Sequence, residues 1–283
     1  MTAATTAAET AAETAAAHRT AAELTLVVHA DAGVLARAAA ARLITALVDA
    51  QAARGEASLV LTGGGIGIAL LRAVRANPAC DAVDWSKVDI WWGDERFVPA
   101  DSPDRNELQA RQALLDHIPV DGRRVFPMGH LATRTVGGDV EEGGTSGGHT
   151  EAESAAAEYT AMLAARAAAG RPVPEFDVLL LGLGPETHIA SIFPDSPAAV
   201  AVEPVVAVHD CPKPPPTRVS MTFPTIQAAR QVWVVVAGEE KADAVARALA
   251  ADADPVHVPA AAAKGRERTL WLVDRAAASR LPG

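Results

Sequence analysis

Residues 182–194 combine glycines with side chains that can move a proton. His188 follows Gly182 and Gly184 and stands two residues after Glu186. An imidazole has a pKa near neutrality, so it can take a proton from water, and a nearby carboxylate can orient the ring or raise its basicity. A single histidine is more often structural. Here the paired glycines, the carboxylate and the apolar stretch before them favour a catalytic base at His188.

A second charged segment is the run 91–96, which reads Trp-Trp-Gly-Asp-Glu-Arg. Arg96 could bind a phosphate or stabilise a developing oxyanion, and Asp94 could orient the guanidinium. Three charged residues directly after an apolar stretch are unusual for a plain turn. The alternative is a solvated turn that contains an internal salt bridge.

A glycine-rich run, 63–67, gives the third candidate. Glycines let the backbone approach a phosphate, and the N-terminus of a following helix supplies N–H donors and a positive dipole. The run lacks the Gly-Lys-Ser/Thr of a P-loop and the spacing of a dinucleotide fingerprint. Phosphate binding and a tight structural turn therefore both remain open. Arg218 and Lys241 could face the same phosphate, or could be ordinary surface residues.

Repeated strand–helix units must position these segments. Apolar runs predict strands at 24–29, 58–62, 88–92, 176–181, 205–208, 218–222, 231–237 and 269–273. Helices are predicted from the N-cap Asp31 to 54, from the glycine run to 76, and at 106–117, 151–169 and 239–249. Fully apolar strands that alternate with helices indicate an α/β fold with a mainly parallel sheet covered on both faces. Ligands bind beyond the carboxyl ends of such strands, where all three candidate segments lie.

Composition narrows the class of protein. The chain has 283 residues and a formal net charge of −10, which argues against nucleic-acid and anionic-membrane partners. We expect a low-complexity tail at 1–22 and a single domain at 23–283, with a Gly-rich surface loop near 136–149. Two isolated cysteines, no long apolar run and no signal-peptide pattern indicate a cytoplasmic protein. Metal-binding motifs are missing from the sequence, and we expect no cofactor and no metal.

Together, these segments resemble the 6-phosphogluconolactonase family. The matching segments are 61–64, 92–99 with Asn106 downstream, 180–194, 216–222 and 238–242. The resemblance runs from about Leu24 to Leu281, and the segments that begin at Trp92 and Gly182 are the specific ones. It implies a Rossmann-like fold shared with glucosamine-6-phosphate deaminases. It also implies metal-free hydrolysis of 6-phosphoglucono-δ-lactone to 6-phosphogluconate, in the oxidative pentose phosphate pathway.

The resemblance also implies roles for individual residues. We expect His188 to activate a water molecule that attacks the lactone carbonyl, with Glu186 orienting the ring. Arg96 or backbone N–H groups would stabilise the oxyanion, and Asp94 would position Arg96. The residues expected to bind the substrate are Thr62, Gly63, Gly64, Gly65, Asn106, Gly184, Arg218 and Lys241. The expected partner is a small phosphorylated sugar lactone, bound by a monomer or a weak homodimer.

The sequence departs from the family pattern at two places. The family usually has Asp-Gly-His where this chain has Glu186-Thr187-His188. If the backbone of Thr187 requires a positive φ, its β-branched side chain is strained, and catalysis could be weakened. The first loop often carries Ser or Thr after its glycines, but this chain has Ile66 and Gly67. That leaves backbone rather than side-chain contacts to a phosphate.

Two other functions remain open from the sequence. One is a glucosamine-6-phosphate deaminase or isomerase, although in that family the histidine loop continues into Asn-Glu-Pro. Here the corresponding residues are Ser191-Ile192-Phe193-Pro194. The other is a sugar-phosphate-binding domain without catalysis. Such sensors usually carry a basic helical DNA-binding module, for which 1–22 is too short and too poor in basic residues.

Overall fold

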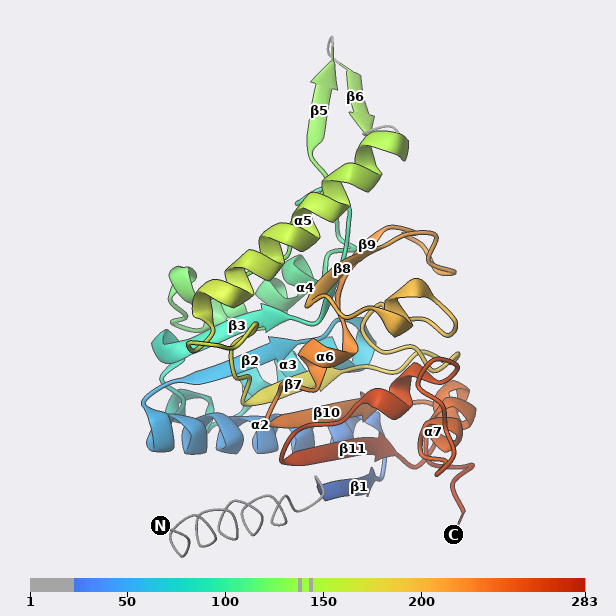
Figure 1. Ribbon diagram of the computed structural model, residues 1–283. Helices are drawn as coiled ribbons and strands as arrows, with labels where there is room; N and C mark the ends of the chain where they lie inside the picture. The colour runs from blue at the N-terminus through green and yellow to red at the C-terminus, as the bar shows by residue number, and fades with distance from the viewer. Residues whose placement is uncertain (1–22, 137–138, 143–144, 283) are drawn as a thin grey trace, which may run out of the picture.

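A parallel sheet of six strands forms the centre of the protein (Figure 1). The computed structural model describes the backbone of residues 23–136, 139–142 and 145–282, and the side chains of 23–132 and 150–282. The predicted tail at 1–22 lies outside the described residues. In spatial order the strands are β1 (Glu23–His29), β11 (Arg268–Asp274), β10 (Gln231–Val236), β7 (Val178–Leu181), β2 (Ala57–Leu61) and β3 (Val88–Trp92).

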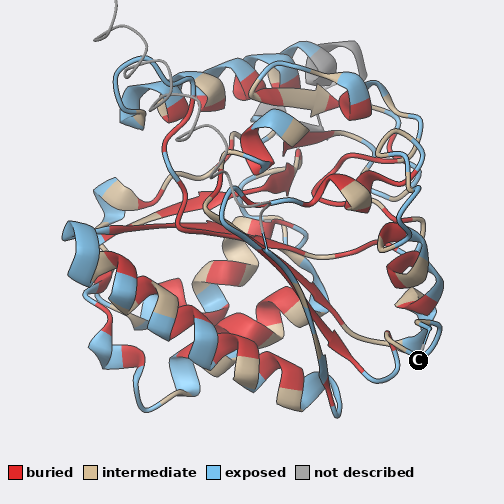
Figure 2. Ribbon diagram, turned by 60° about the horizontal axis from the view of Figure 1, so that its bottom comes forward, coloured by how far each residue is buried: buried red, intermediate tan, exposed pale blue. Residues whose placement is uncertain are grey.

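Helices cover both faces of this sheet (Figures 1 and 2). One face carries α2 (Ala32–Arg54), α3 (Gly64–Ala76) and α4 (Asn106–Ala113), and the other carries α5 (Thr145–Arg166), α6 (Phe223–Ile226) and α7 (Ala242–Ala248). Every residue of β2 and β7 is buried, as a sheet covered on both faces requires. The predicted α/β architecture with a mainly parallel sheet is therefore confirmed.

The ends of α2 follow the local signals in the sequence. The Asp31 carboxylate accepts a hydrogen bond of 2.8 Å from the Val34 N–H, which satisfies one of the free donors of the first turn. Gly55 ends the helix with φ +81°, a left-handed conformation that glycine adopts at little steric cost.

A second, antiparallel sheet stands beside the first. It consists of β4 (Asp94–Arg96), β9 (Arg218–Met221) and β8 (Val205–Val208), in that order. The strands predicted near 205–208 and 218–222 exist, but they pair outside the main sheet. Gly93 joins the two sheets, because its N–H donates to Leu61 O and its carbonyl accepts from Met221 N. This junction brings Asp94 and Arg96 alongside Arg218.

Three predicted segments differ in detail. Within 136–149, the described backbone forms part of a hairpin of β5 (Thr133–Val136) and β6 (Asp139–Glu142) and the start of α5, rather than a loop (Figure 1). The β-branched residues of β5 favour a strand. The predicted helix 106–117 ends as α4 at Ala113, and the predicted helix 239–249 begins as a 3-10 turn. The 3-10 helices are Cys80–Ala82, Trp85–Lys87, Leu115–His117, Gly122–Arg124, Pro197–Val200, Glu239–Lys241 and Pro259–Ala262.

Candidate active site

A cavity of about 280 Å³ lies beyond the carboxyl ends of β2, β3 and β7. Its wall contains every predicted site residue except Gly65 and Glu186. It also contains Lys213, which the sequence analysis did not select. Gly65 lines an adjoining cavity that shares Gly63 and Gly64. The three segments chosen for their chemistry therefore meet at one place.

A tight loop fixes His188. The Gly184 N–H donates to His188 O over 2.9 Å, and the Thr187 N–H donates to Gly184 O over 2.9 Å. The imidazole lies against Gly184, because a Cβ built on that glycine would stand 1.9 Å from Nδ1 of His188. On the other side, the Phe193 ring centroid is 4.5 Å from that of the imidazole. A glycine at 184 is thus required by the position of the ring.

Burial makes His188 a weak base that is neutral near pH 7. Only 16% of its side chain is exposed, and this desolvation lowers the pKa to about 4. The Glu186 carboxylate acts in the opposite direction, since its Oε1 lies 3.2 Å from Nδ1. This contact is not an aligned hydrogen bond, so the buried Nδ1 has no hydrogen-bond partner among the described residues. A neutral ring is the form that can accept a proton.

Glu186 is shared between His188 and Lys213. Its Oε2 accepts a hydrogen bond of 2.9 Å from Lys213 Nζ. Burial raises the pKa of Glu186, but the Lys213 hydrogen bond and further contacts outweigh burial and leave that pKa below its usual value. Lys213 is the cation of the Pro-rich run 211–216, and its place directly before Pro214 was the signal that could have identified it.

Thr187 adopts the positive φ that was considered from the sequence, and its backbone is therefore strained. Its φ is +80°, its side chain is fully buried, and its Oγ1 has no partner among the described residues. A left-handed conformation costs a residue with a Cβ roughly 1–2 kcal/mol. The Thr187 carbonyl accepts from Ala260 N over 3.0 Å, which ties the loop to Pro259–Ala262.

Asp94 is held by Ser191 and not by Arg96. The Ser191 hydroxyl donates to Asp94 Oδ2 over 2.6 Å, and both side chains are buried. Hydrogen bonds and ion pairs between Asp94 and Arg96 side chains, both of which the structure describes, are absent. The expected pairing of Asp94 with Arg96 is therefore wrong. Ser191 was known from the sequence as part of a motif, but its partner 97 positions away was not.

Arg96 is positioned by Asn106 instead. Its Nη1 donates to the Asn106 side-chain oxygen and, over 2.9 Å, to Asp104 O. The Asn106 amide donates in turn to Asp94 O over 2.9 Å. A Cβ on Gly63 would stand 1.9 Å from the Asn106 oxygen, so this glycine makes room for the asparagine.

Glu95 has a structural role within the same charged segment. Its buried carboxylate accepts hydrogen bonds from the backbone N–H groups of Asn106 and Glu107, at the start of α4. Arg105 lies 3.7 Å from it. Burial raises the pKa of Glu95, although Arg105 and these N–H donors oppose the shift. The alternative of a solvated turn with an internal salt bridge is therefore wrong, because Glu95 is buried and pairs with Arg105 outside the segment, while Arg96 lines the cavity.

Arg218 is largely occupied by the protein's own backbone. The buried guanidinium donates to the carbonyl oxygens of Lys213 at 3.2 Å, Pro214 at 3.4 Å and Pro215 at 3.2 Å. Its Nη1 also lies 3.5 Å from the Ser191 hydroxyl. The structure therefore places Arg218 at the cavity, where it anchors the Pro-rich run.

The glycine loop and Lys241 complete the wall. The Thr62 hydroxyl accepts from Gly182 N over 3.3 Å, which links the first and third loops. Gly64 has φ +81°, and Gly63 caps α3 without a side chain. The first N–H groups of this helix are free of a side-chain cap, as in phosphate-binding loops. Burial and the neighbouring Lys213 both lower the pKa of Lys241.

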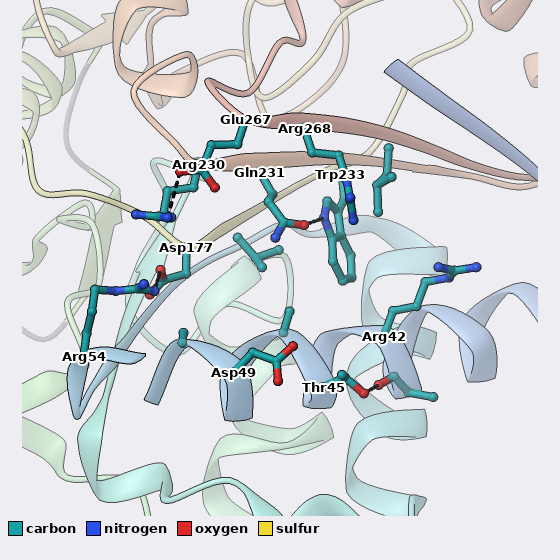
Figure 3. Close-up of a pocket in the computed structure, with 15 residues that line it drawn as sticks. Arg42, Thr45, Asp49, Arg54, Asp177, Arg230, Gln231, Trp233, Glu267 and Arg268 are labelled. Atoms are coloured by element: carbon teal, nitrogen blue, oxygen red, sulfur yellow. Dashed lines mark hydrogen bonds and ion pairs between the residues drawn. The ribbon is translucent and has the colours of Figure 1, made fainter. Parts of the chain in front are cut away.

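A larger cavity, of about 510 Å³, lies at the opposite end of the sheet (Figure 3). It is formed by α2 and by the first residues of β7, β10 and β11. Arg54 pairs there with Asp177, and Arg230 pairs with Glu267 at 2.8 Å. The Trp233 indole N–H donates to the Gln231 side chain over 3.0 Å. Its wall holds these ion pairs, together with the exposed Arg42 and Asp49, and no histidine.

Metal clusters and membrane-spanning helices are both absent from the described part of the chain. No group of three or more His, Cys, Asp or Glu residues there is arranged to hold a metal ion. None of the described helices is long and apolar enough to cross a membrane.

Comparisons with known proteins identify the family. The family model described as glucosamine-6-phosphate isomerases/6-phosphogluconolactonase matches residues 30–271. The chain belongs to this family. It is 54% identical to a 6-phosphogluconolactonase of Streptomyces coelicolor, over 91% of this chain and 94% of that protein. It is 50% identical to a 6-phosphogluconolactonase of Mycobacterium tuberculosis, over 91% and 98% of the two chains.

Solved structures agree with this family membership. A 6-phosphogluconolactonase from Trypanosoma brucei aligns with a TM-score of 0.75 and 28% identity, over 93% of this chain and all of that one. A monomeric glucosamine-6-phosphate deaminase aligns with a TM-score of 0.71, over 90% and 99% of the chains, but with 18% identity, so it shows a shared fold alone. The resemblance inferred from the sequence is confirmed.

Proposed function

We propose that this protein hydrolyses 6-phosphoglucono-δ-lactone to 6-phosphogluconate, a step of the oxidative pentose phosphate pathway. The observation that carries the proposal is a neutral His188 next to a carboxylate, at a small cavity lined by Arg96, Lys213 and Lys241. The relatives that are 50–54% identical over nine tenths of the chain bear the name of this activity. The geometry of the site and the names of these relatives both support a hydrolase that acts on a sugar lactone.

The reaction follows from a base of this kind. His188 takes a proton from water while the water oxygen bonds to the lactone carbonyl carbon. The carbonyl electrons move onto oxygen, and when they return, the bond from carbon to the ring oxygen breaks. His188 gives its proton to that ring oxygen, which becomes a hydroxyl, and the new carboxylic acid ionises. General acid–base help of this type contributes about 10²–10⁴-fold to the rate.

The cations divide between the two ends of the substrate. Arg96, fixed by Asn106, is the side chain proposed to stabilise the oxyanion. The 6-phosphate is assigned to the N–H groups of Gly63–Gly65 and to Lys241, at the end of the cavity next to α3. Because Arg218 already binds three carbonyls, it contributes its positive charge and the shape of the wall. Contacts to the phosphate hold the carbonyl near the water.

The substrate, the oligomeric state and the cellular location are also part of the proposal. The substrate is a small phosphorylated sugar lactone, bound without a cofactor. We propose that the protein acts in the cytoplasm as a monomer or a weak homodimer, which size-exclusion chromatography with light scattering would test.

A paired assay tests the proposed function. Purified protein is given 6-phosphoglucono-δ-lactone in a pH-stat, with the spontaneous rate subtracted, and glucosamine 6-phosphate in a separate assay for ammonia. We expect acid release from the lactone and no ammonia. Ammonia release without lactone hydrolysis would support the deaminase alternative, and binding of both compounds without turnover would support a non-catalytic domain.

A further inference from the structure

We propose that Lys213 is a positioning residue for the catalytic base. By holding one oxygen of the Glu186 carboxylate, it keeps the other against Nδ1 of His188, which leaves Nε2 to meet water in the cavity. This inference rests on the proposed function, since it assigns His188 the role of base. It adds a residue to the catalytic assembly and makes the Pro-rich run part of the site.

The contacts of Glu186 support this arrangement. Oε2 lies 2.9 Å from Lys213 Nζ and is hydrogen-bonded to it, and Oε1 lies 3.2 Å from His188 Nδ1 in a charge contact, so one carboxylate stands between the two side chains. Lys213 and His188 both line the cavity, whereas Glu186 lines a neighbouring one. The glutamate is one methylene longer than an aspartate and has more rotamers to lose. A second contact that fixes its far oxygen therefore matters more for a glutamate than for a shorter carboxylate.

Lys213 lies in the Pro-rich run 211–216, and Arg218 fixes the backbone of this run. Arg218 donates to the carbonyl oxygens of Lys213 and of the two prolines that follow it. Pro212 precedes the lysine, and proline rings restrict the backbone on both sides of it. Arg218 is buried and is the first residue of β9, the central strand of the antiparallel sheet, so the position of the Lys213 ammonium group is tied to that sheet. A flexible surface lysine would have no such support.

The charges around His188 predict the direction in which its pKa changes when Lys213 or Glu186 is replaced. Four charged groups face the imidazole, namely Glu186 on its own loop, Lys213 on the Pro-rich run, Asp94 on β4 and Arg218 on β9. The two carboxylates favour the protonated ring, and the two cations oppose it. Removing Lys213 should therefore raise the pKa of His188, whereas removing the charge of Glu186 should lower it.

A simpler role for Lys213 makes a different prediction. Lys241 also faces Lys213 and Glu186, and two neighbouring cations at a cavity suit a phosphate. If Lys213 were a phosphate ligand and nothing more, its loss would raise KM for the lactone and weaken inhibition by inorganic phosphate. The turnover number would stay unchanged, whereas the acid limb of the pH profile would still move, because the positive charge of Lys213 is lost in either case.

The experiment compares Lys213→Met, Lys213→Arg, Glu186→Gln and the Lys213→Met/Glu186→Gln double variant, with Lys241→Met as the matched control. We expect Lys213→Met to lower kcat about tenfold, because a displaced base loses its alignment, and to move the acid limb to higher pH. Lys213→Arg should restore most of kcat. Glu186→Gln should move the limb to lower pH, and in its background Lys213→Met should lower kcat little further. Lys241→Met should raise KM and leave the limb in place.

An NMR titration of His188 without substrate tests the coupling of Lys213 to His188 independently of lactone hydrolysis. The His188 ring is followed by NMR in protein labelled at histidine, with His188→Gln used to assign its signal. We expect the Lys213→Met variant to titrate at higher pH than the wild type. A wild-type protein that fails to hydrolyse the lactone would overturn the proposed function, and an unchanged titration would separately overturn the coupling of Lys213 to His188. An unchanged kcat for Lys213→Met in an active enzyme would overturn the positioning role of Lys213, even with a shifted titration, because the loss of charge alone shifts it.

Discussion

Two charged cavities lie at opposite ends of the same sheet, and they differ in how their polar groups are satisfied. At the end that Figure 3 shows, Arg54 and Asp177 bind each other, and Arg230 binds acidic neighbours. At the His188 end, Thr187 is held at positive φ with a buried hydroxyl that has no partner, and the buried Nδ1 of His188 is not aligned with its carboxylate. Positive φ at residues other than glycine occurs at the His188 end, where Ala190 of the cavity wall also has it, and not in the wall of the larger cavity. The buried Ser58 hydroxyl beside Asp177, however, also lacks a hydrogen-bond partner among the described residues.

The difference shows why cavity size and charge alone do not locate an active site. Groups that satisfy one another stabilise the fold and have little left with which to bind a ligand. A group kept in an unfavourable state by its surroundings can gain from a substrate, which is why such groups concentrate at functional sites. The larger cavity is therefore expected to matter for stability, and the smaller one for chemistry.

Removal of the base should have the largest effect. We expect His188→Ala to lower kcat by about 10²–10⁴-fold while KM changes little, because the imidazole acts in the transition state and not in holding the phosphate. Steady-state lactone hydrolysis, corrected for the spontaneous rate, measures it. His257→Ala is the control, because His257 is exposed and lies away from the cavity wall. Near-normal turnover in His188→Ala would remove the histidine from the mechanism.

A methyl group at Gly184 should be the next most damaging change. Its Cβ would overlap Nδ1 of His188, so the ring must leave its place, and a displacement of about 1 Å can cost about 10²-fold in rate. Gly182→Ala is the matched control, since its Cβ would meet only the Thr62 hydroxyl, at an ordinary 3.9 Å. Equal kcat values for the two variants would show that the ring does not depend on Gly184.

The low pKa of His188 should appear in the acid stability of the protein. Its pKa is about 4 in the folded state and about 6.5 in an unfolded chain, so the unfolded chain binds the proton first. The stability from this group is complete above pH 6.5 and is lost as the pH falls towards 4, by at most about 3 kcal/mol. Denaturant unfolding of the wild type and His188→Gln across this range measures the difference. Parallel curves for the two proteins would contradict it.

Substitutions in the larger cavity, which Figure 3 shows, should change the stability of the protein and not its activity. The Asp177 carboxylate accepts from Arg54 and from the Ser58 N–H, so Asp177→Ala should lower the free energy of unfolding by about 2 kcal/mol. The kcat/KM of the folded variant should stay within about twofold of the wild type. Asp49→Ala is the control, because Asp49 is an exposed carboxylate of the same wall. A loss of kcat/KM in Asp177→Ala would end the distinction between the two cavities.

The sequence by itself determined the features that depend on local chemistry. Apolar runs located the strands, Asp31 and Gly55 marked the ends of α2, and the glycines around His188 marked its loop. Each of these signals acts over a few residues, where backbone geometry and side-chain type are enough. The order of motifs also carried the family resemblance, which the comparisons confirmed.

The tertiary structure decided which distant groups meet. Asp94 binds Ser191, and Glu186 binds Lys213, across 97 and 27 positions of the chain. Nothing in the spacing of either pair indicates the contact, because it depends on how Gly93 carries the chain from the parallel sheet into the antiparallel one. The strand pairing of β4 with β9 then fixes Arg218, and with it the Pro-rich run beside His188. Sequence signals are short-range, whereas the surroundings that tune His188 are assembled by long-range pairing.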